Sequence, residues 1–268
     1  MKEVDLEQSS VPVFASWREG VGGFLGEVKD AMGGLLYPRV CAGCGRGVVA
    51  SGRAGLCEGC FGDLRPLRAP ICEKCGEPYA GEVSGPFRCS NCADRTFSFD
   101  YAVAAYRGEG LMRELIHRFK YQRAFYLGRV LGELMEDVFW DGRVDMSDDW
   151  VLVPVPLHAR RKREREFNQA AELCRVLRRR HDWPVVGVLK RTRYTSVQVS
   201  LDRAERLANM EGAFDMRPWG GWRGRLEGRS VFLVDDVLTT GATAHGCARV
   251  LKERAGADKV VVLTLARS

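Results

Sequence analysis

The chain has 268 residues, of which 46% are hydrophobic and 28% are charged, a composition typical of a globular protein that folds in water. No apolar run reaches about 18 residues, the length that a membrane-spanning helix needs, so we predict no membrane insertion. The first ten residues, MKEVDLEQSS, lack the basic and apolar segments of a secretory signal. We therefore predict a cytoplasmic protein.

The positive charge of the chain is concentrated in one segment. Residues 160–193 contain twelve Lys and Arg against four Asp and Glu, whereas the formal net charge of the whole chain is only +6. This local excess predicts a site for an anionic ligand. The total charge is a weak argument for nucleic acid, because eight thiolates that bind two Zn²⁺ ions would lower it to about +2.

Taken in chain order, the sequence predicts three parts. Residues 1–36 form a polar lead that ends in a short helix, and residues 37–95 form a cysteine-rich module. Residues 96–268 form the largest part, in which apolar runs alternate with amphipathic segments. This alternation predicts an α/β fold with a mainly parallel sheet. The expected strands are 97–106, 150–157, 185–190, 231–236 and 259–266, and the expected helices are 111–121, 124–139, 167–180 and 242–256.

The cysteine-rich module contains four C-x-x-C pairs. Such a pair fits a tight turn that presents two sulfur atoms to one metal ion. The first pair recurs thirty-one residues later and the second recurs thirty-two residues later, so the module holds two copies of one small unit. In sequence order the pairs form two Cys₄ sites with zinc-ribbon spacing, namely Cys41, Cys44, Cys57 and Cys60, and then Cys72, Cys75, Cys89 and Cys92.

Zinc is the metal that this pattern favours. Redox-active cysteine pairs or an iron–sulfur site would not account for four matched pairs in two copies. We predict two structural Zn²⁺ ions, because closed Cys₄ sites supply folding energy to segments with little hydrophobic core. An interleaved grouping of the four pairs stays open, since spacing alone does not fix the connectivity.

The stretch VFLVDDVLTTGAT, from Val231 to Thr243, predicts an anion-binding site. An apolar strand is followed by two aspartates, a turn of small and hydroxyl residues, and a helix. Backbone N–H groups in such a turn, together with the positive end of the helix dipole, bind a phosphate. The aspartates suit sugar hydroxyls or Mg²⁺ instead. A phosphate cradle beside a carboxylate pair describes a site for ribose 5-phosphate.

This stretch resembles the thirteen-residue phosphoribosyl pyrophosphate (PRPP) motif of type I phosphoribosyltransferases. With the cysteine module in front, residues 35–267 resemble the ComF/ComFC family, phosphoribosyltransferase-like proteins associated with bacterial competence. The resemblance also rests on VPVPLHARRKREREFNQA, TSVQVSLDRAERLANMEGAF and the terminal LTLAR. It implies a type I phosphoribosyltransferase fold behind a double zinc ribbon.

The resemblance also implies roles for individual residues. Asp235 and Asp236 would bind the ribose hydroxyls, with Mg²⁺ bridging sugar and pyrophosphate. The 5-phosphate would be held by Thr239, Thr240, Gly241, Ala242 and Thr243. The pyrophosphate would be bound by the loop after the strand at 150–157, with Arg160, Arg161 and Arg165 as partners, and by Lys120.

One residue departs from the family pattern. The family commonly has Arg-Gly-Phe-Asn-Gln in the pyrophosphate loop, where this chain has Glu166 in place of the glycine. A carboxylate at that position either turns outward or weakens pyrophosphate binding.

Two functions from different classes follow from the sequence. The first is transfer of the phosphoribosyl group from PRPP to an unknown acceptor with release of pyrophosphate. The second is a non-catalytic protein that senses PRPP or handles single-stranded DNA. The resemblance implies a role in competence and DNA uptake, with single-stranded DNA or DNA-uptake proteins as partners.

Overall fold

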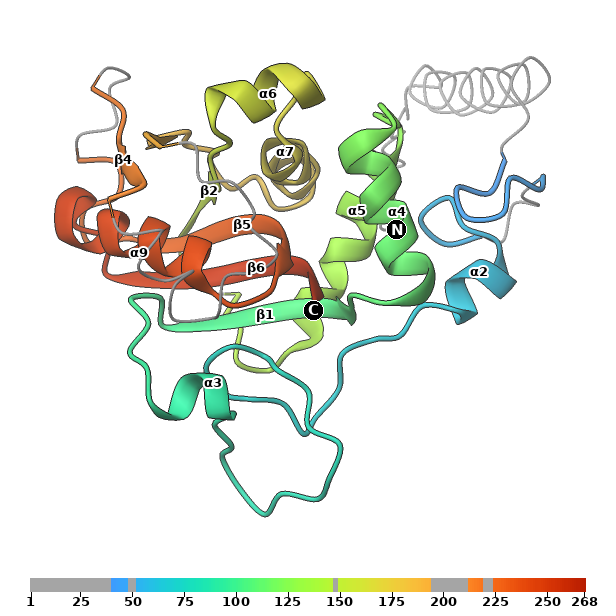
Figure 1. The fold of residues 1–268 in the computed structure, drawn as a ribbon, viewed down its shortest axis with the longest axis horizontal. Coiled ribbons are helices and arrows are strands. Elements are labelled where there is room, and N and C mark those ends of the chain that lie inside the picture. Colours follow the sequence, from blue (N-terminus) through green and yellow to red (C-terminus); the bar gives the residue numbers. More distant parts are fainter. Residues whose placement is uncertain (1–39, 48–51, 147–148, 194–211, 219–223) are drawn as a thin grey trace, which may run out of the picture.

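The computed structural model describes residues 40–47, 52–146, 149–193, 212–218 and 224–268. Its centre is a four-stranded sheet in the order β1-β6-β5-β2, in which all neighbouring strands are parallel (Figure 1). The strands are β1 (Tyr101–Arg107), β2 (Trp150–Pro154), β5 (Ser230–Leu238) and β6 (Lys259–Arg267). The predicted α/β fold with a mainly parallel sheet is thereby confirmed.

The apolar strands are buried on both faces, as is usual for parallel sheets. In β5, Phe232 and Val234 belong to one hydrophobic core, and Val231 and Leu233 belong to the other. The first core contains α4 (Gly110–Tyr121), α5 (Leu127–Met135) and α7 (Gln169–His181). The second contains α9 (Ala242–Ala255) and the antiparallel pair β3 (Leu189–Arg191) and β4 (Phe214–Met216).

The two copies of the cysteine unit pack on different faces of this sheet. Cys41 and Cys60 lie in the core that contains α4 and α5, next to the short helix α2 (Glu58–Gly62). The four cysteines from residue 72 to residue 92 lie in the core that contains α9, next to α3 (Ser90–Ala93). Figure 1 shows α2 beside α4, and α3 near β1.

Several predicted boundaries are wrong. The expected strand at 97–106 begins only at Tyr101, and the expected helix at 124–139 divides into α5 and a 3₁₀ helix, η1 (Glu136–Trp140). The expected strand at 185–190 shrinks to β3, which lies outside the main sheet. The expected loop after β2 contains a short helix, α6 (Ala159–Arg165), because the His158 side chain accepts a hydrogen bond from Arg160 N and caps its first turn.

The predicted lead at 1–36 lies outside the described residues. Much of the stretch TSVQVSLDRAERLANMEGAF also lies outside them. Within the described residues, the helices are all too short or too polar to cross a membrane.

Candidate functional site

The site lies where β5 and β2 end, side by side, at the carboxyl edge of the sheet. In open parallel sheets this edge is the usual place for a ligand. A hollow of about 270 Å³ opens here between the end of β5, the residues after β2 and the end of α4. Asp235 and Asp236, hereafter the acid pair, line it together with Lys120, Arg161 and Arg165.

A second, smaller hollow of about 50 Å³ adjoins the first. It is lined by residues 239–243, hereafter the motif loop, and it shares Asp235, Thr239 and Thr243 with the larger hollow. Gly241 has a φ of 79°, a left-handed conformation that favours glycine, and it directly precedes α9. The first N–H groups of α9 are therefore at the small hollow, where an anion would meet the positive end of the helix.

The acid pair is in direct contact with a cation. Lys120 Nζ lies 2.7 Å from Asp236 Oδ1, and the exposed fractions of the two side chains are 19% and 9%. Loss of hydration and the charge of Asp236 raise the pKa of Asp235 to about 7, although Lys120 and Arg165 act in the opposite direction. The pair has the carboxylate oxygens that Mg²⁺ prefers, and Lys120 provides positive charge beside it.

The basic residues of α6 do not all face the hollow. Arg161 and Arg165 line it, whereas the Arg160 side chain forms an ion pair of 3.0 Å with Glu164 and is not among the lining residues. Arg165 is fixed by hydrogen bonds to Tyr121 Oη (3.1 Å) and Gln169 Oε1 (3.2 Å). The helical turn of α6 explains the difference, because adjacent positions of a helix point in different directions.

Glu166 turns toward a neighbouring loop. It has a φ of 68°, the left-handed conformation that the family's glycine would adopt freely. Its Oε1 lies 2.5 Å from Nη2 of Arg123, in the loop between α4 and α5, and Arg123 also has a positive φ, of 52°. Of the two alternatives that the sequence leaves open, the structure has the outward-turned glutamate, with its charge compensated by an arginine.

Replacing Glu166 with glycine is expected to strengthen pyrophosphate binding about threefold to tenfold. The change removes a negative charge near the hollow and releases Arg123. A residue with a Cβ carries a strain of roughly 1 kcal/mol in the left-handed conformation, and glycine does not. Relief of this strain offsets loss of the exposed ion pair between Glu166 and Arg123, which contributes a similar free energy. Titration calorimetry with pyrophosphate and Mg²⁺ measures the effect. Glu164→Gln, which removes a charge from the same helix, is the control, and equal effects of both changes would contradict the prediction.

The eight cysteines of the C-x-x-C pairs form two clusters in sequence order. In the first cysteine site (Cys41, Cys44, Cys57, Cys60) and in the second (Cys72, Cys75, Cys89, Cys92) all sulfur atoms lie within 4.8 Å of one another. These distances suit four ligands around one metal ion. The structure thus groups the pairs sequentially and not in the interleaved way.

Hydrogen bonds favour the thiolate form at Cys41, Cys44 and Cys72, whereas burial raises the pKa of Cys60 to about 12. Backbone N–H groups of Cys57 and Cys89 donate to the sulfurs of Cys41 (3.2 Å) and Cys72 (3.4 Å). Arg46 donates to Cys44 and lowers the pKa of that thiol to about 6. Since metals bind the thiolate form, this environment fits a bound cation.

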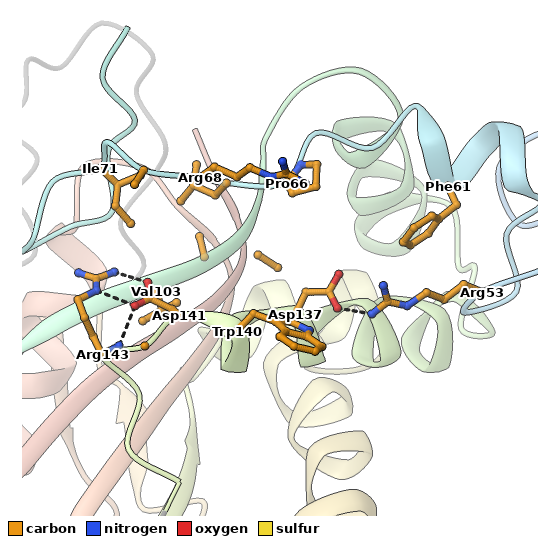
Figure 2. A pocket seen from close by; sticks show the side chains of 15 residues that line it. Arg53, Phe61, Pro66, Arg68, Ile71, Val103, Asp137, Trp140, Asp141 and Arg143 are labelled. Atoms are coloured by element: carbon orange, nitrogen blue, oxygen red, sulfur yellow. Dashed lines mark hydrogen bonds and ion pairs between the residues drawn. The ribbon is translucent and has the colours of Figure 1, made fainter. Parts of the chain in front are cut away.

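A larger groove, of about 780 Å³, shares no lining residue with the acid pair or the motif loop (Figure 2). It lies between the segment that joins the two cysteine sites, the edge strand β1 and the end of η1. Three arginines line it, and Arg53 and Arg143 form ion pairs with Asp137 and Asp141. Trp140 stands at its side and is 84% exposed.

Comparison with known proteins places these features in a family. Residues 33–94 match the family described as double zinc ribbon domain. The chain is 30% identical to competence protein F of Haemophilus influenzae over 231 residues, which cover 85% of this chain and 96% of that protein. It is also 30% identical to competence protein ComFC of Bacillus subtilis, over 80% of this chain and 84% of that protein.

The chain belongs to the ComF/ComFC family. A further relative is DNA utilization protein YhgH of Escherichia coli, at 30% identity over 87% of this chain and 99% of that protein. Among solved structures, a hypoxanthine phosphoribosyltransferase from Staphylococcus aureus matches with 16% identity and a TM-score of 0.30, covering 58% of this chain and 64% of that chain.

The sequence analysis did not predict two residues that line the hollow at the acid pair. One is Arg191, the last residue of β3, and the other is Asn168, which caps α7 and donates to Val155 O (3.0 Å). Asn168 could have been found from the sequence, because asparagine is a common capping residue and here it directly precedes a segment with helical periodicity of apolar residues. Arg191 is far from the motif in sequence and carries no local signal.

Proposed function

We propose that the protein binds PRPP with Mg²⁺ and transfers its phosphoribosyl group to an acceptor, releasing pyrophosphate. The observation that carries this proposal is the junction of the two hollows. One is a small cradle of backbone N–H groups, and the other contains a carboxylate pair and guanidinium groups. A sugar that carries a phosphate at one end and a pyrophosphate at the other matches this distribution of charge.

Each group has a task in this reaction. The motif loop binds the 5-phosphate, and the acid pair accepts hydrogen bonds from the ribose hydroxyls. Arg161, Arg165 and Lys120 stabilise the negative charge that develops on pyrophosphate as it leaves. The acid pair would hold Mg²⁺, which would supply further neutralisation of the leaving group. The protein needs no nucleophilic side chain, because orientation and charge stabilisation carry the reaction.

We propose that the two cysteine sites each hold a structural Zn²⁺. Both have four sulfur ligands and no open position for a substrate, which is the pattern of structural zinc. Their role is to support the segments of the chain that carry them.

The first test is titration calorimetry of the zinc-loaded protein with PRPP and Mg²⁺. Saturable binding with one ligand per chain is expected. The absence of heat from protein that is folded and contains two zinc ions would overturn the proposal.

The second candidate function is a protein that binds PRPP without transfer and handles single-stranded DNA. The names of the relatives, which refer to competence and DNA utilization, favour it. So does α6, whose residues are all at least partly exposed and mostly basic. A screen of acceptors for PRPP-dependent pyrophosphate release distinguishes transfer from binding alone. Loss of DNA binding in an Arg160→Gln/Lys162→Gln variant, with a steep salt dependence, would support the DNA role.

Binding of PRPP and Mg²⁺ is expected to strengthen about tenfold between pH 6 and pH 8. Asp235 has a pKa of about 7, and only its ionised form binds a cation or two hydroxyls. The same shift makes the folded protein less stable as the pH rises from about 4 to about 7, because the unfolded carboxyl is already ionised there.

Thermal unfolding without ligand isolates this effect from titration of the ligand's own phosphates. The fall in stability between pH 5 and pH 7 is expected to be smaller in Asp235→Asn than in the wild type. Identical pH profiles of the two proteins would contradict the assignment.

A further inference from the structure

The second cysteine site is joined to the motif loop by a buried arginine. Arg267, near the end of β6, has a side chain that is only 3% exposed. Its Nε donates to the carbonyl oxygen of Cys75 (3.1 Å), and its Nη1 donates to that of Leu238 (3.0 Å). Leu238 directly precedes the motif loop. One rigid guanidinium thus fixes the entrance of the loop to a cysteine of the second site, and Glu77 compensates its charge.

A second set of contacts holds the middle of the loop. Asn91 of α3 lies between Cys89 and Cys92, is 7% exposed, and directs Nδ2 toward Thr240 O at 3.5 Å. Arg95 donates to its Oδ1 (3.3 Å), which orients the amide. Phe97 covers Gly241 so closely that an added Cβ would lie 3.1 Å from its ring. The segment that follows the second site therefore forms one wall of the motif loop.

The start of α9 is bound to the same segment. Ser98 N donates to Nδ1 of His245, in the first turn of α9, at 3.0 Å. By contrast, contacts of the first cysteine unit with the α/β domain run to α4, where Arg118 donates to Ala42 O (2.7 Å), and to η1, where Asp137 pairs with Arg53. Among the described residues, the hydrogen bonds that reach the motif loop from the cysteine module come from the second site and its flanking segment.

We propose that Arg267 and Asn91 are positioning residues that lock the motif loop to the second cysteine site. The loop binds phosphate through backbone N–H groups, and such a site is effective only if its donors are fixed before the ligand arrives. Contacts with the second cysteine site keep the motif loop rigid. The part of the inference that concerns ligand affinity rests on the proposed PRPP function, whereas the part that concerns loop rigidity does not.

Hydrogen exchange of the ligand-free, zinc-loaded protein tests the rigidity. Arg267→Lys keeps the charge but lacks the planar guanidinium that donates from Nε to Cys75 O and from Nη1 to Leu238 O, and Asn91→Ala removes the amide. Both are expected to raise exchange of the 239–243 amides about tenfold, the effect of losing one hydrogen bond. Arg88→Gln is the matched control, because Arg88 belongs to the same cysteine unit but forms an exposed ion pair with Glu73. It is expected to leave exchange in the loop unchanged. If Arg267→Lys does not fold, Asn91→Ala decides.

Titration with two partial ligands separates positioning from general destabilisation. Ribose 5-phosphate reports on the motif loop, whereas pyrophosphate reports on Arg161 and Arg165. In both variants the affinity for ribose 5-phosphate is expected to fall about tenfold and the affinity for pyrophosphate less than twofold. Both variants are expected to retain two zinc ions.

The inference would be overturned if hydrogen exchange of the motif loop were unchanged in both variants. It would also be overturned if the affinities for the two ligands fell equally. If the wild type binds neither ligand, the proposed function fails. The exchange data then still decide whether the second cysteine site fixes the loop.

Discussion

Replacing Asp235 and Asp236 together with asparagine is expected to weaken PRPP and Mg²⁺ binding at least about 100-fold. Asparagine keeps the shape of the side chain but removes two negative charges, so that Mg²⁺ loses its ligands and the ribose hydroxyls lose charged acceptors. Lys120 loses its partner at 2.7 Å as well. Titration calorimetry at pH 8 measures the loss, with pyrophosphate as a second ligand.

The fold is expected to tolerate this change. Asp235 is poorly hydrated and has a raised pKa, so its ionised form destabilises the folded protein at pH 8, and removal of that charge offsets loss of the Asp236–Lys120 ion pair. Asp63→Asn, an exposed carboxylate at the end of α2, serves as the control for loss of charge. Affinity within twofold of the wild type in the double variant would show that PRPP does not bind at the acid pair.

Features encoded in short stretches were predictable from the sequence. The run of apolar residues before Asp235 predicts a buried strand, and β5 is buried on both faces. The two matched C-x-x-C pairs of each copy predict a Cys₄ cluster, and each cluster forms. Both patterns are local, because side-chain periodicity and tight turns depend on neighbouring residues.

Features without an apolar pattern, and features that depend on distant contacts, were not predictable. The segment after β2 reads as a loop because its charged residues show no apolar face, yet α6 forms there, and only Arg161 and Arg165 of the predicted arginines line the hollow. Arg267 reads as one more basic residue at the end of a strand. Its role depends on a hydrogen bond to Cys75, 192 positions away in the chain, and sequence periodicity does not predict a contact between such distant residues.

Loss of metal from the second cysteine site is expected to destabilise the protein more than loss from the first. All four cysteines of the second site are buried in the core that contains α9, whereas Cys44 of the first is exposed. A structural zinc contributes its binding free energy to folding, and unpaired buried thiolates carry an additional desolvation cost. Cys72→Ser is therefore expected to lower Tm by roughly 10 °C or more, and Cys44→Ser by less.

Thermal unfolding combined with zinc quantification checks this order. Each variant is expected to retain one zinc ion, and Cys174→Ser, at a buried cysteine of α7 outside both sites, is the control for the chemical change. A hydroxyl in the core costs stability without releasing metal. The physical basis is where each site is anchored. The first packs against α4 and α5 near the surface, whereas the second is continuous with the sheet and the motif loop. A larger fall in Tm for Cys44→Ser than for Cys72→Ser would contradict this account of which cysteine site supports the motif loop.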